Sequence, residues 1–246
     1  MKKFTWRTNL ILALIAASLI FYLINYLVFK DPAFMLRLTT LQLGFVPISV
    51  ILITIILNGL FARREKRDRL AKLNMVIGAF FGEAGTQLLK SFSGFDPNRE
   101  KISEPLIVTM EWSDRDFATA RTQAKHYDYG IELHTGNLEE LKSFLIGKRD
   151  FLLRLLENPN LLEHESFTDL LWAISHLTEE LAYRADFTKL PDTDLAHIAS
   201  DMKRAYGLLV SEWIAYMQHL RDNYPYLYSL AVRTNPLDPN ASPEVR

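Results

Sequence analysis

The chain has 246 residues, with 28 Lys and Arg against 29 Asp and Glu, and no cysteine. The lack of cysteine excludes a disulfide framework, a thiolate nucleophile and a cysteine-ligated zinc or iron–sulfur centre. The near-zero net charge hides a split, because residues 1–72 carry a net charge of +8 and residues 73–246 carry −9. The acidic part lacks the clustered basic face that nucleic-acid binding requires, so we expect no nucleic-acid partner.

Two apolar runs open the chain. Residues 10–29 carry no charge, and a run of this length matches the ~20 residues that cross a bilayer core. A second run follows at 43–61, and the first is longer than the ~7–15 apolar residues of a signal peptide. The pattern therefore favours a membrane hairpin over a cleaved signal, with spans at about 10–29 and 43–61 and a surface link over residues 30–41.

Basic residues flank both runs on the same side. Lys2, Lys3 and Arg7 precede the first run, and a basic collar follows the second. Lys and Arg concentrate in cytoplasmic flanks, so both termini are predicted to be cytoplasmic at the cell inner (plasma) membrane. The collar is a topology signal and is expected to bind lipid headgroups, at ~1 kcal/mol per basic residue. Its residues are Arg63, Arg64, Lys66, Arg67, Arg69 and Lys72.

The rest of the chain is predicted to be helical. The collar continues into a connecting helix over 62–95, and prolines mark a linker over 96–112 that includes a short strand or turn at 106–110. Helices with apolar spacings of three and four then fill residues 113–234, and a tail over 235–246 is expected to be disordered. The predicted class is all-α: a two-helix transmembrane hairpin followed by a cytoplasmic helical bundle of about four or five helices.

Helix starts within the bundle carry capping signals. Ser113 with Asp116 forms a capping-box pattern, and Asn137 with Glu140 forms another. Asp192 or Thr193 is expected to cap the last long helix, and Pro225 is expected to end or kink it. The preceding helix is expected to run from about 161 or 166 to 185.

One face of that preceding helix gathers polar and aromatic side chains beside its apolar stripe. This face indicates a ligand pocket, an interface or a helix–helix seam, and it consists of Asp169, Trp172, His176, Glu180 and Tyr183. His176 and Glu180 are four residues apart and are the candidate metal ligands. No Glu-x-x-His occurs on the last two long helices, and His197, Asp201 and Glu212 lie off the apolar stripe. The sequence therefore favours a solvated face there and no cofactor, with a divalent metal as the alternative.

Known catalytic motifs are missing from the sequence. It has no Gly-x-Ser-x-Gly, no phosphate loop of the Gly-x-x-x-x-Gly-Lys type and no His-Glu-x-x-His. The first apolar run carries small residues that favour close helix packing, so a homo-oligomer or a protein partner is expected. These small residues are Ala13, Ala16, Ala17 and Ser18.

Two stretches carry a resemblance to a known group of proteins. The first is the aromatic-rich end of the chain, with Trp213, Tyr216, Tyr224, Tyr226 and Tyr228 followed by residues 229–236; the second is residues 171–181. Together they resemble a family of prokaryotic membrane proteins with two N-terminal spans and a C-terminal helical cytoplasmic domain. The resemblance covers residues 75–236 and implies this architecture without an activity.

The sequence thus favours a membrane-anchored interaction or signal-relay module without catalytic activity. The relay hypothesis rests on the absence of a helix breaker between the second apolar run and the collar. Flexible glycines inserted near Leu73 test it, because they should uncouple the two halves of the chain. The alternatives are a metal-binding protein or metal-dependent enzyme that uses bundle carboxylates and histidines, and a small channel or transporter accessory subunit.

Overall fold

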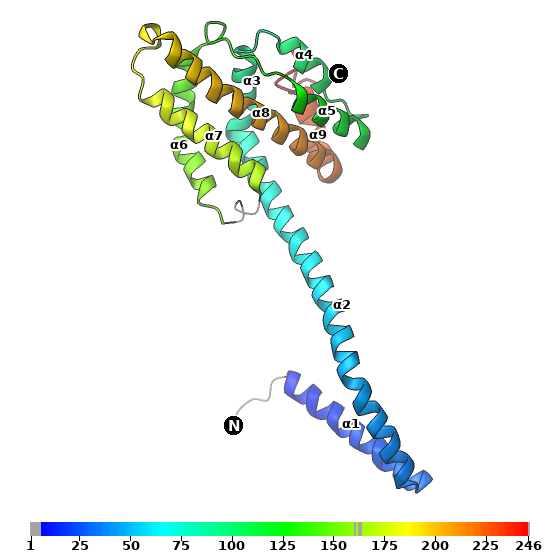
Figure 1. The fold of residues 1–246 in the computed structure, drawn as a ribbon. Coiled ribbons are helices and arrows are strands. Elements are labelled where there is room, and N and C mark those ends of the chain that lie inside the picture. The colour runs from blue at the N-terminus through cyan, green and yellow to red at the C-terminus, as the bar shows by residue number, and fades with distance from the viewer. Residues whose placement is uncertain (1–5, 160, 162–163, 246) are drawn as a thin grey trace. The chain divides into compact units, whose positions relative to one another are not determined.

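The computed structural model describes residues 6–159, 161 and 164–245, except for the side chains of residues 7–8, 62–72 and 103–104. The chain forms two compact units, residues 1–66 and residues 67–246. Every regular element among the described residues is a helix, which confirms the all-α class (Figure 1). The six candidate lipid-binding residues of the collar fall in the segment whose side chains are not described.

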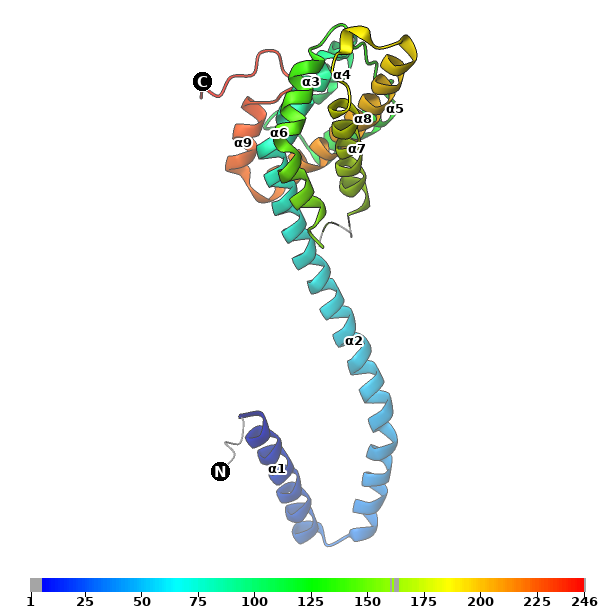
Figure 2. The ribbon, with the colours of Figure 1, turned by 90° about the vertical axis from the view of Figure 1, so that its left-hand side faces the viewer.

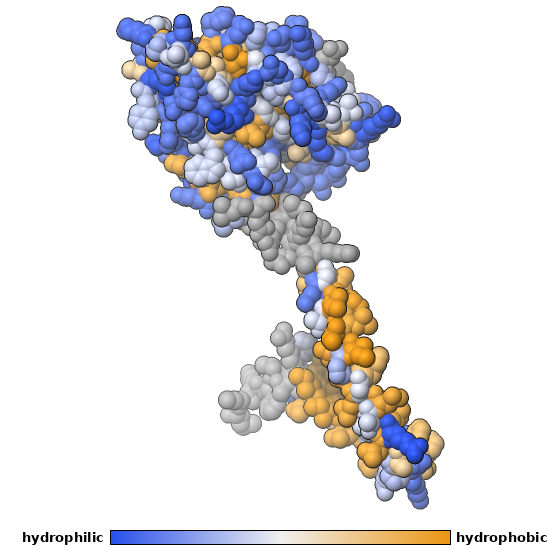
Figure 3. Space-filling view, viewed as in Figure 1, coloured by the Kyte–Doolittle hydropathy of each residue, from blue (hydrophilic) through white to orange (hydrophobic). Residues whose placement is uncertain are grey.

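The first unit is a pair of apolar helices, α1 (Trp6–Phe29) and the first part of α2 (Pro32–Phe80). Tyr22 Oη donates a hydrogen bond to Gln42 Oε1 at 3.3 Å and links the two. The segments Asn9–Phe29 and Pro32–Phe61 are long and apolar enough to cross a membrane, and none of their most apolar residues is buried. Figure 3 shows the resulting apolar surface of this unit.

The predicted link over 30–41 is shorter in the structure, because α2 already begins at Pro32. Lys30 turns the chain with a φ of 48°, and Asp31 Oδ1 accepts a hydrogen bond from the Phe34 amide at 3.0 Å. An acidic cap followed by proline is a strong helix start. Residues 32–61 span about 45 Å as a helix, more than the ~30 Å bilayer core. Because α2 begins at Pro32, Pro47 lies in the helix interior and not in its first turns.

The second unit is built around α8 (Asp192–Asn223). This helix packs against α7 (Glu165–Ala182), α5 (Asp114–His126), α3 (Thr86–Gly94) and α9 (Pro225–Arg233), and α6 (Leu138–Leu156) packs on α7 (Figures 1 and 2). The predicted stripe of α7 is fully buried. Its residues are Phe167, Leu170, Leu171, Ile174, Leu177 and Leu181.

The predicted connecting helix over 62–95 is helical as far as Gly94 and contains one π-helical turn. A π-helical turn, η1 (Phe81–Gly85), separates α2 from α3, and Thr86 Oγ1 donates to the Phe81 carbonyl at 2.8 Å. A Cβ at Gly85 would lie 2.6 Å from the Phe80 ring and 2.7 Å from the Phe81 ring. Glycine is therefore required where these two aromatic side chains close over the turn.

Local capping signals are realised at two of the predicted starts. Ser113 and Asp116 form the reciprocal capping box of α5, and Asn137 Oδ1 accepts from the Glu140 amide at 3.1 Å at the start of α6. The cap of α8 is instead Pro191, which makes no side-chain bond. Asp192 and Thr193 lie in the first turn, where an acidic side chain still favours the positive helix end.

The segment predicted as a linker is helical in part. It contains α4 (Arg99–Ser103) and the 3-10 turn η2 (Glu104–Leu106), and its described residues form no strand. In the C-terminal segment expected to be disordered, Asn235 is 1% and Leu237 4% exposed. Asn235 Nδ2 donates to the Leu106 carbonyl at 2.9 Å, so this part of the tail packs on the bundle.

Candidate metal centre

The hairpin of α7 and α8 brings four residues of metal-ligating types together. The two helices pack against each other (Figures 1 and 2), and a short connection with the 3-10 turn η4 (Phe187–Lys189) joins them. His176 and Glu180 are four residues apart on α7, and His197 and Asp201 are four apart on α8. This spacing puts each pair on one face of its helix. His176, Glu180, His197 and Asp201 form what we name the α7–α8 cluster.

The two imidazole rings converge on both carboxylates. His176 Nε2 lies 3.3 Å from Asp201 Oδ2 and 3.8 Å from Glu180 Oε1. His197 Nε2 lies 3.4 Å from Asp201 Oδ2 and 3.7 Å from Glu180 Oε2. Donor atoms of His176, Glu180 and His197 all lie within 4.8 Å of one another.

Asp201 is the most telling member of the cluster. Its side chain is 3% exposed, and its Oδ2 is a buried oxygen without a hydrogen-bond partner among the described residues. Both ring nitrogens lie within 3.4 Å of that oxygen, at the distance of an ion pair if the rings are protonated. An unpaired buried carboxylate oxygen is costly. A cation placed among these atoms would satisfy this oxygen and the two ring nitrogens together.

The spacing of the donor atoms suits a metal ion. Two ligand atoms each about 2.1 Å from a tetrahedral ion lie about 3.4 Å apart. Two imidazole nitrogens with carboxylate oxygens, and no thiolate, suit borderline divalent ions such as Zn²⁺, Co²⁺, Fe²⁺ or Mn²⁺. The side chains of His176 and His197 are 46% and 51% exposed. The site is therefore open on one side, as in metal sites that exchange water or ligands.

Arg184 fixes the position of Glu180. It donates to Glu180 Oε2 at 2.6 Å and forms a two-pronged pair with Asp194, through Nε at 2.7 Å and a terminal nitrogen at 2.6 Å. These bonds join the end of α7 to the start of α8. The hydrogen bond from Arg184 holds the pKa of Glu180 below its ordinary value, and the pKa of Asp194 is lowered by the same partner. Both carboxylates therefore stay charged beside the cluster.

The structure places most of the polar and aromatic face predicted on α7 along the same seam. Asp169, Trp172 and His176 line a pocket of about 420 Å³, together with Ala173, Arg204 and Leu208. Tyr183 is 89% exposed and does not line this pocket. Glu180 belongs to the cluster. The structure thus brings four of the five predicted residues to one seam.

Two acidic residues expected on a solvated face are buried. Asp201 is 3% exposed and Glu212 4%, because α8 is surrounded by other helices. Ser166 Oγ donates to Glu212 Oε1 at 2.6 Å, which ties α7 to α8 at a second point. The repeated spacing of histidine and carboxylate, four residues apart on each of two successive helices, is the signal that could have identified His197 and Asp201 as partners of His176 and Glu180.

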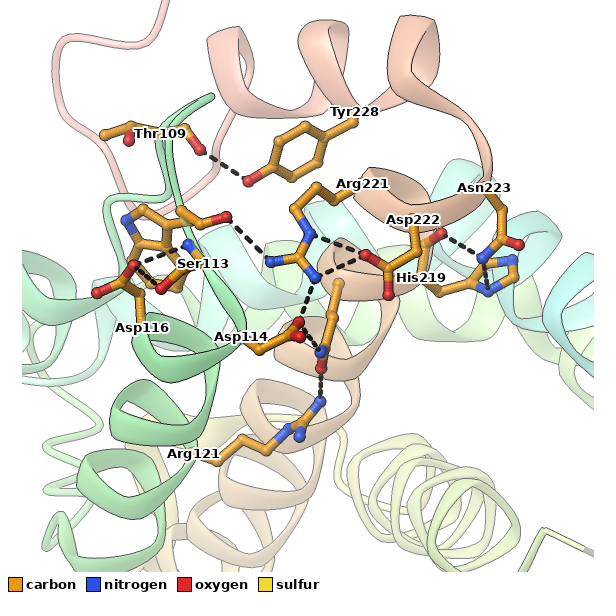
Figure 4. A network of polar contacts seen from close by, with 12 residues as sticks. Thr109, Ser113, Asp114, Asp116, Arg121, His219, Arg221, Asp222, Asn223 and Tyr228 are labelled. Carbon is orange, nitrogen blue, oxygen red and sulfur yellow. Dashed lines mark hydrogen bonds and ion pairs between the residues drawn. The ribbon is translucent and has the colours of Figure 1, made fainter.

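A second polar concentration lies between α5 and α8 and has a structural role (Figure 4). Arg221 donates to the Trp112 carbonyl at 3.0 Å and to Asp114 and Asp222, and it lies over the Phe117 ring at 4.9 Å. The hydrogen bond from Arg221 lowers the pKa of Asp114. These contacts occupy the guanidinium on several sides, which suits a helix-packing clamp.

Comparison with known proteins matches this chain in two parts. Residues 69–233 match the family model described as "Uncharacterized protein MJ1433, C-terminal helical domain", and residues 2–61 match "MJ1433, N-terminal helical domain". The chain belongs to the MJ1433 family. The protein named "Uncharacterized protein MJ1433" from Methanocaldococcus jannaschii is 43% identical over 227 residues, which cover 92% of this chain and 91% of that protein. No solved structure matches.

Membership of the MJ1433 family confirms that the chain belongs to an uncharacterised family with an N-terminal and a C-terminal helical domain. The matched C-terminal domain includes all four residues of the α7–α8 cluster. The matched N-terminal domain includes the two apolar segments of the first unit.

Proposed function

We propose that this chain is a membrane-anchored metal-binding protein whose helical domain binds one divalent transition-metal ion at the α7–α8 cluster. The single observation that carries the proposal is the buried Asp201 Oδ2, which has no hydrogen-bond partner among the described residues and lies 3.3 and 3.4 Å from two histidine nitrogens. The two apolar helices of the first unit support the anchor, since their length and composition suit a bilayer.

An ion-pair cluster without metal is the competing interpretation. In that case protonated His176 and His197 would pair with Asp201 Oδ2 across the same contacts of 3.3 and 3.4 Å. The convergence of both ring nitrogens on one buried oxygen supports a shared cation, because a single ion would satisfy all three atoms together. The neighbouring charges leave room for a cation, because Arg184 divides its hydrogen bonds between Glu180 and Asp194.

Elemental analysis of the full-length protein tests the proposal. The protein is purified in detergent without a histidine tag, and its content of zinc, iron, manganese and cobalt is measured before and after incubation with each ion. We expect one ion per chain. His176→Ala, His197→Ala and Asp201→Asn should each lose it, with affinity at least 100-fold lower, about 2.7 kcal/mol.

His134→Ala is the matched control. His134 Nε2 lies 3.3 Å from Glu132 Oε2, a similar histidine–carboxylate contact, but its side chain is 81% exposed and outside the cluster. This variant should keep the full metal content. Protein that takes up none of the four ions, or a His176→Ala/His197→Ala double variant that binds as tightly as the parent, would overturn the proposal.

The relay hypothesis is compatible with this proposal and stays a prediction. A metal site on the helical domain would give such a module something to sense. The glycine insertion near Leu73 remains its test. The readout is the metal-dependent behaviour of the full-length protein, compared with and without the insertion.

A further inference from the structure

We propose that the pocket beside the α7–α8 cluster binds a planar organic monocarboxylate, and that the carboxylate of this ligand coordinates the bound metal. This inference rests on the proposed function, because it assigns a ligand class to the same site. The pocket has a volume of about 420 Å³ and is lined by Asp169, Trp172, Ala173, His176, Arg204 and Leu208.

The pocket and the metal site share a wall. His176 lines the pocket and also contributes a ring nitrogen to the cluster. Ala173 on α7 and Arg204 on α8 each lie three residues from a cluster residue, and both line the pocket. A ligand in the pocket would therefore meet the metal on the side where the histidine rings are half exposed. An ion held by imidazoles and carboxylates with one side open keeps exchangeable positions.

Arg204 supplies the cationic partner for an anionic ligand. One of its terminal nitrogens lies 3.5 Å from Asp201 Oδ1, and its side chain is 61% exposed. This places a guanidinium beside the metal ligand Asp201 and at the pocket wall at once. Guanidinium groups bind carboxylates through two parallel hydrogen bonds, whereas a lysine ammonium acts as a single point charge. A carboxylate could thus be shared between Arg204 and the metal.

Trp172 gives the pocket its preference for a flat body. Its indole is 61% exposed although the residue sits on a helix with a fully buried stripe. Ala173 and Leu208 add apolar surface next to it. An exposed indole beside apolar side chains favours a planar ring, which can stack on it and remove apolar area from water.

Asp169 limits the far end of the ligand. It lies seven residues before His176 on α7, which corresponds to about 10 Å along the helix. A carboxylate at this end disfavours a ligand with a second negative charge. The pocket therefore selects a single anionic group, directed toward the metal.

The test uses full-length protein in detergent, loaded with Co²⁺, whose visible absorption reports changes in its ligands. Acetate, benzoate and terephthalate are titrated separately. Benzoate should shift the Co²⁺ bands and bind at least tenfold tighter than acetate, and terephthalate should bind more weakly than benzoate. Trp172→Ala should abolish the advantage of benzoate, Arg204→Ala should weaken both monocarboxylates about tenfold, and Asp169→Asn should improve terephthalate binding.

Tyr183→Ala and Arg115→Ala are the matched controls, because both residues are exposed and neither lines the pocket. They should bind benzoate as the parent does. Protein that shows Co²⁺ bands but no response to benzoate would overturn this inference and leave the metal site intact. Equal benzoate affinity in the parent, Trp172→Ala and Arg204→Ala would overturn it as well. Absence of Co²⁺ bands in the parent would instead refute the metal site itself.

Discussion

Asp201→Asn separates a metal ligand from an ion-pair partner, because the two roles predict opposite effects on stability. The substitution keeps the shape of the side chain and removes its charge. The Asp201 side chain is 3% exposed and has one oxygen without a hydrogen-bond partner among the described residues. Leaving a buried polar group unpaired costs about 1–3 kcal/mol. We therefore expect the metal-free variant to unfold with the same free energy as the parent, or one higher by about 1 kcal/mol.

Metal should stabilise the parent protein but not the Asp201→Asn variant. An ion present at 100 times its Kd adds about 2.7 kcal/mol to the free energy of unfolding. For a domain the size of residues 67–246, each kcal/mol corresponds to about 2–4 °C in Tm, so the expected rise is about 5–11 °C. The assay is thermal loss of the helical circular dichroism signal in detergent, with and without Zn²⁺. Asp201→Asn should show no rise.

An exposed carboxylate provides the control for this experiment. Asp128, whose side chain is 89% exposed, pairs with Lys203 on the surface. Asp128→Asn should keep the full metal-dependent rise in Tm. The reasoning would be refuted if Zn²⁺ raised the Tm of Asp201→Asn as much as that of the parent. It would also be refuted if metal-free Asp201→Asn were destabilised by more than about 2 kcal/mol, the result expected for a carboxylate that pairs with charged histidines.

Two further substitutions test the polar contacts around α8. Arg184→Ala should weaken metal binding about 10–100-fold. Arg184 does not bind the metal itself, but its hydrogen bond orients the ligand Glu180. The folded-state pKa values of Glu180 and Asp194 lie below their ordinary 4.5 and 3.8. Their contribution to stability is therefore present above about pH 4.5 and is lost as pH falls through the lowered values. The difference in free energy of unfolding between the parent and Arg184→Ala, followed by acid unfolding, should therefore vanish at low pH. A variant with unchanged metal affinity and the same pH dependence as the parent would contradict this role. Arg221→Ala should lower the free energy of unfolding by about 1–3 kcal/mol without changing metal affinity, because it removes hydrogen bonds to the Asp114 carboxylate and the Trp112 carbonyl; a metal affinity that falls with it would argue against a purely structural clamp.

Much of the secondary structure follows from short stretches of sequence. The apolar stripe of α7 alone predicts which face is buried, because side chains three and four residues apart share one side of a helix. The capping box at Ser113 and the cap at Asn137 each depend on groups within three residues, so they form wherever the helix starts. The two apolar segments likewise reveal themselves by length and lack of charge. Interactions of this range need no knowledge of the rest of the fold.

The α7–α8 cluster depends on tertiary structure. Asp201 lies off the apolar stripe of its helix, and sequence periodicity assigns such a residue to solvent. It is buried because α8 is packed on several sides, by α7, α5, α3 and α9, which leaves little of its circumference exposed. Its meeting with His176 also depends on the register of α7 against α8, which the packing of the hairpin and its connection set. The sequence by itself determined the helices and the spacing of four within each pair, whereas only the packed bundle decided that the two pairs face each other, because distances between helices are fixed by side chains far apart in the chain.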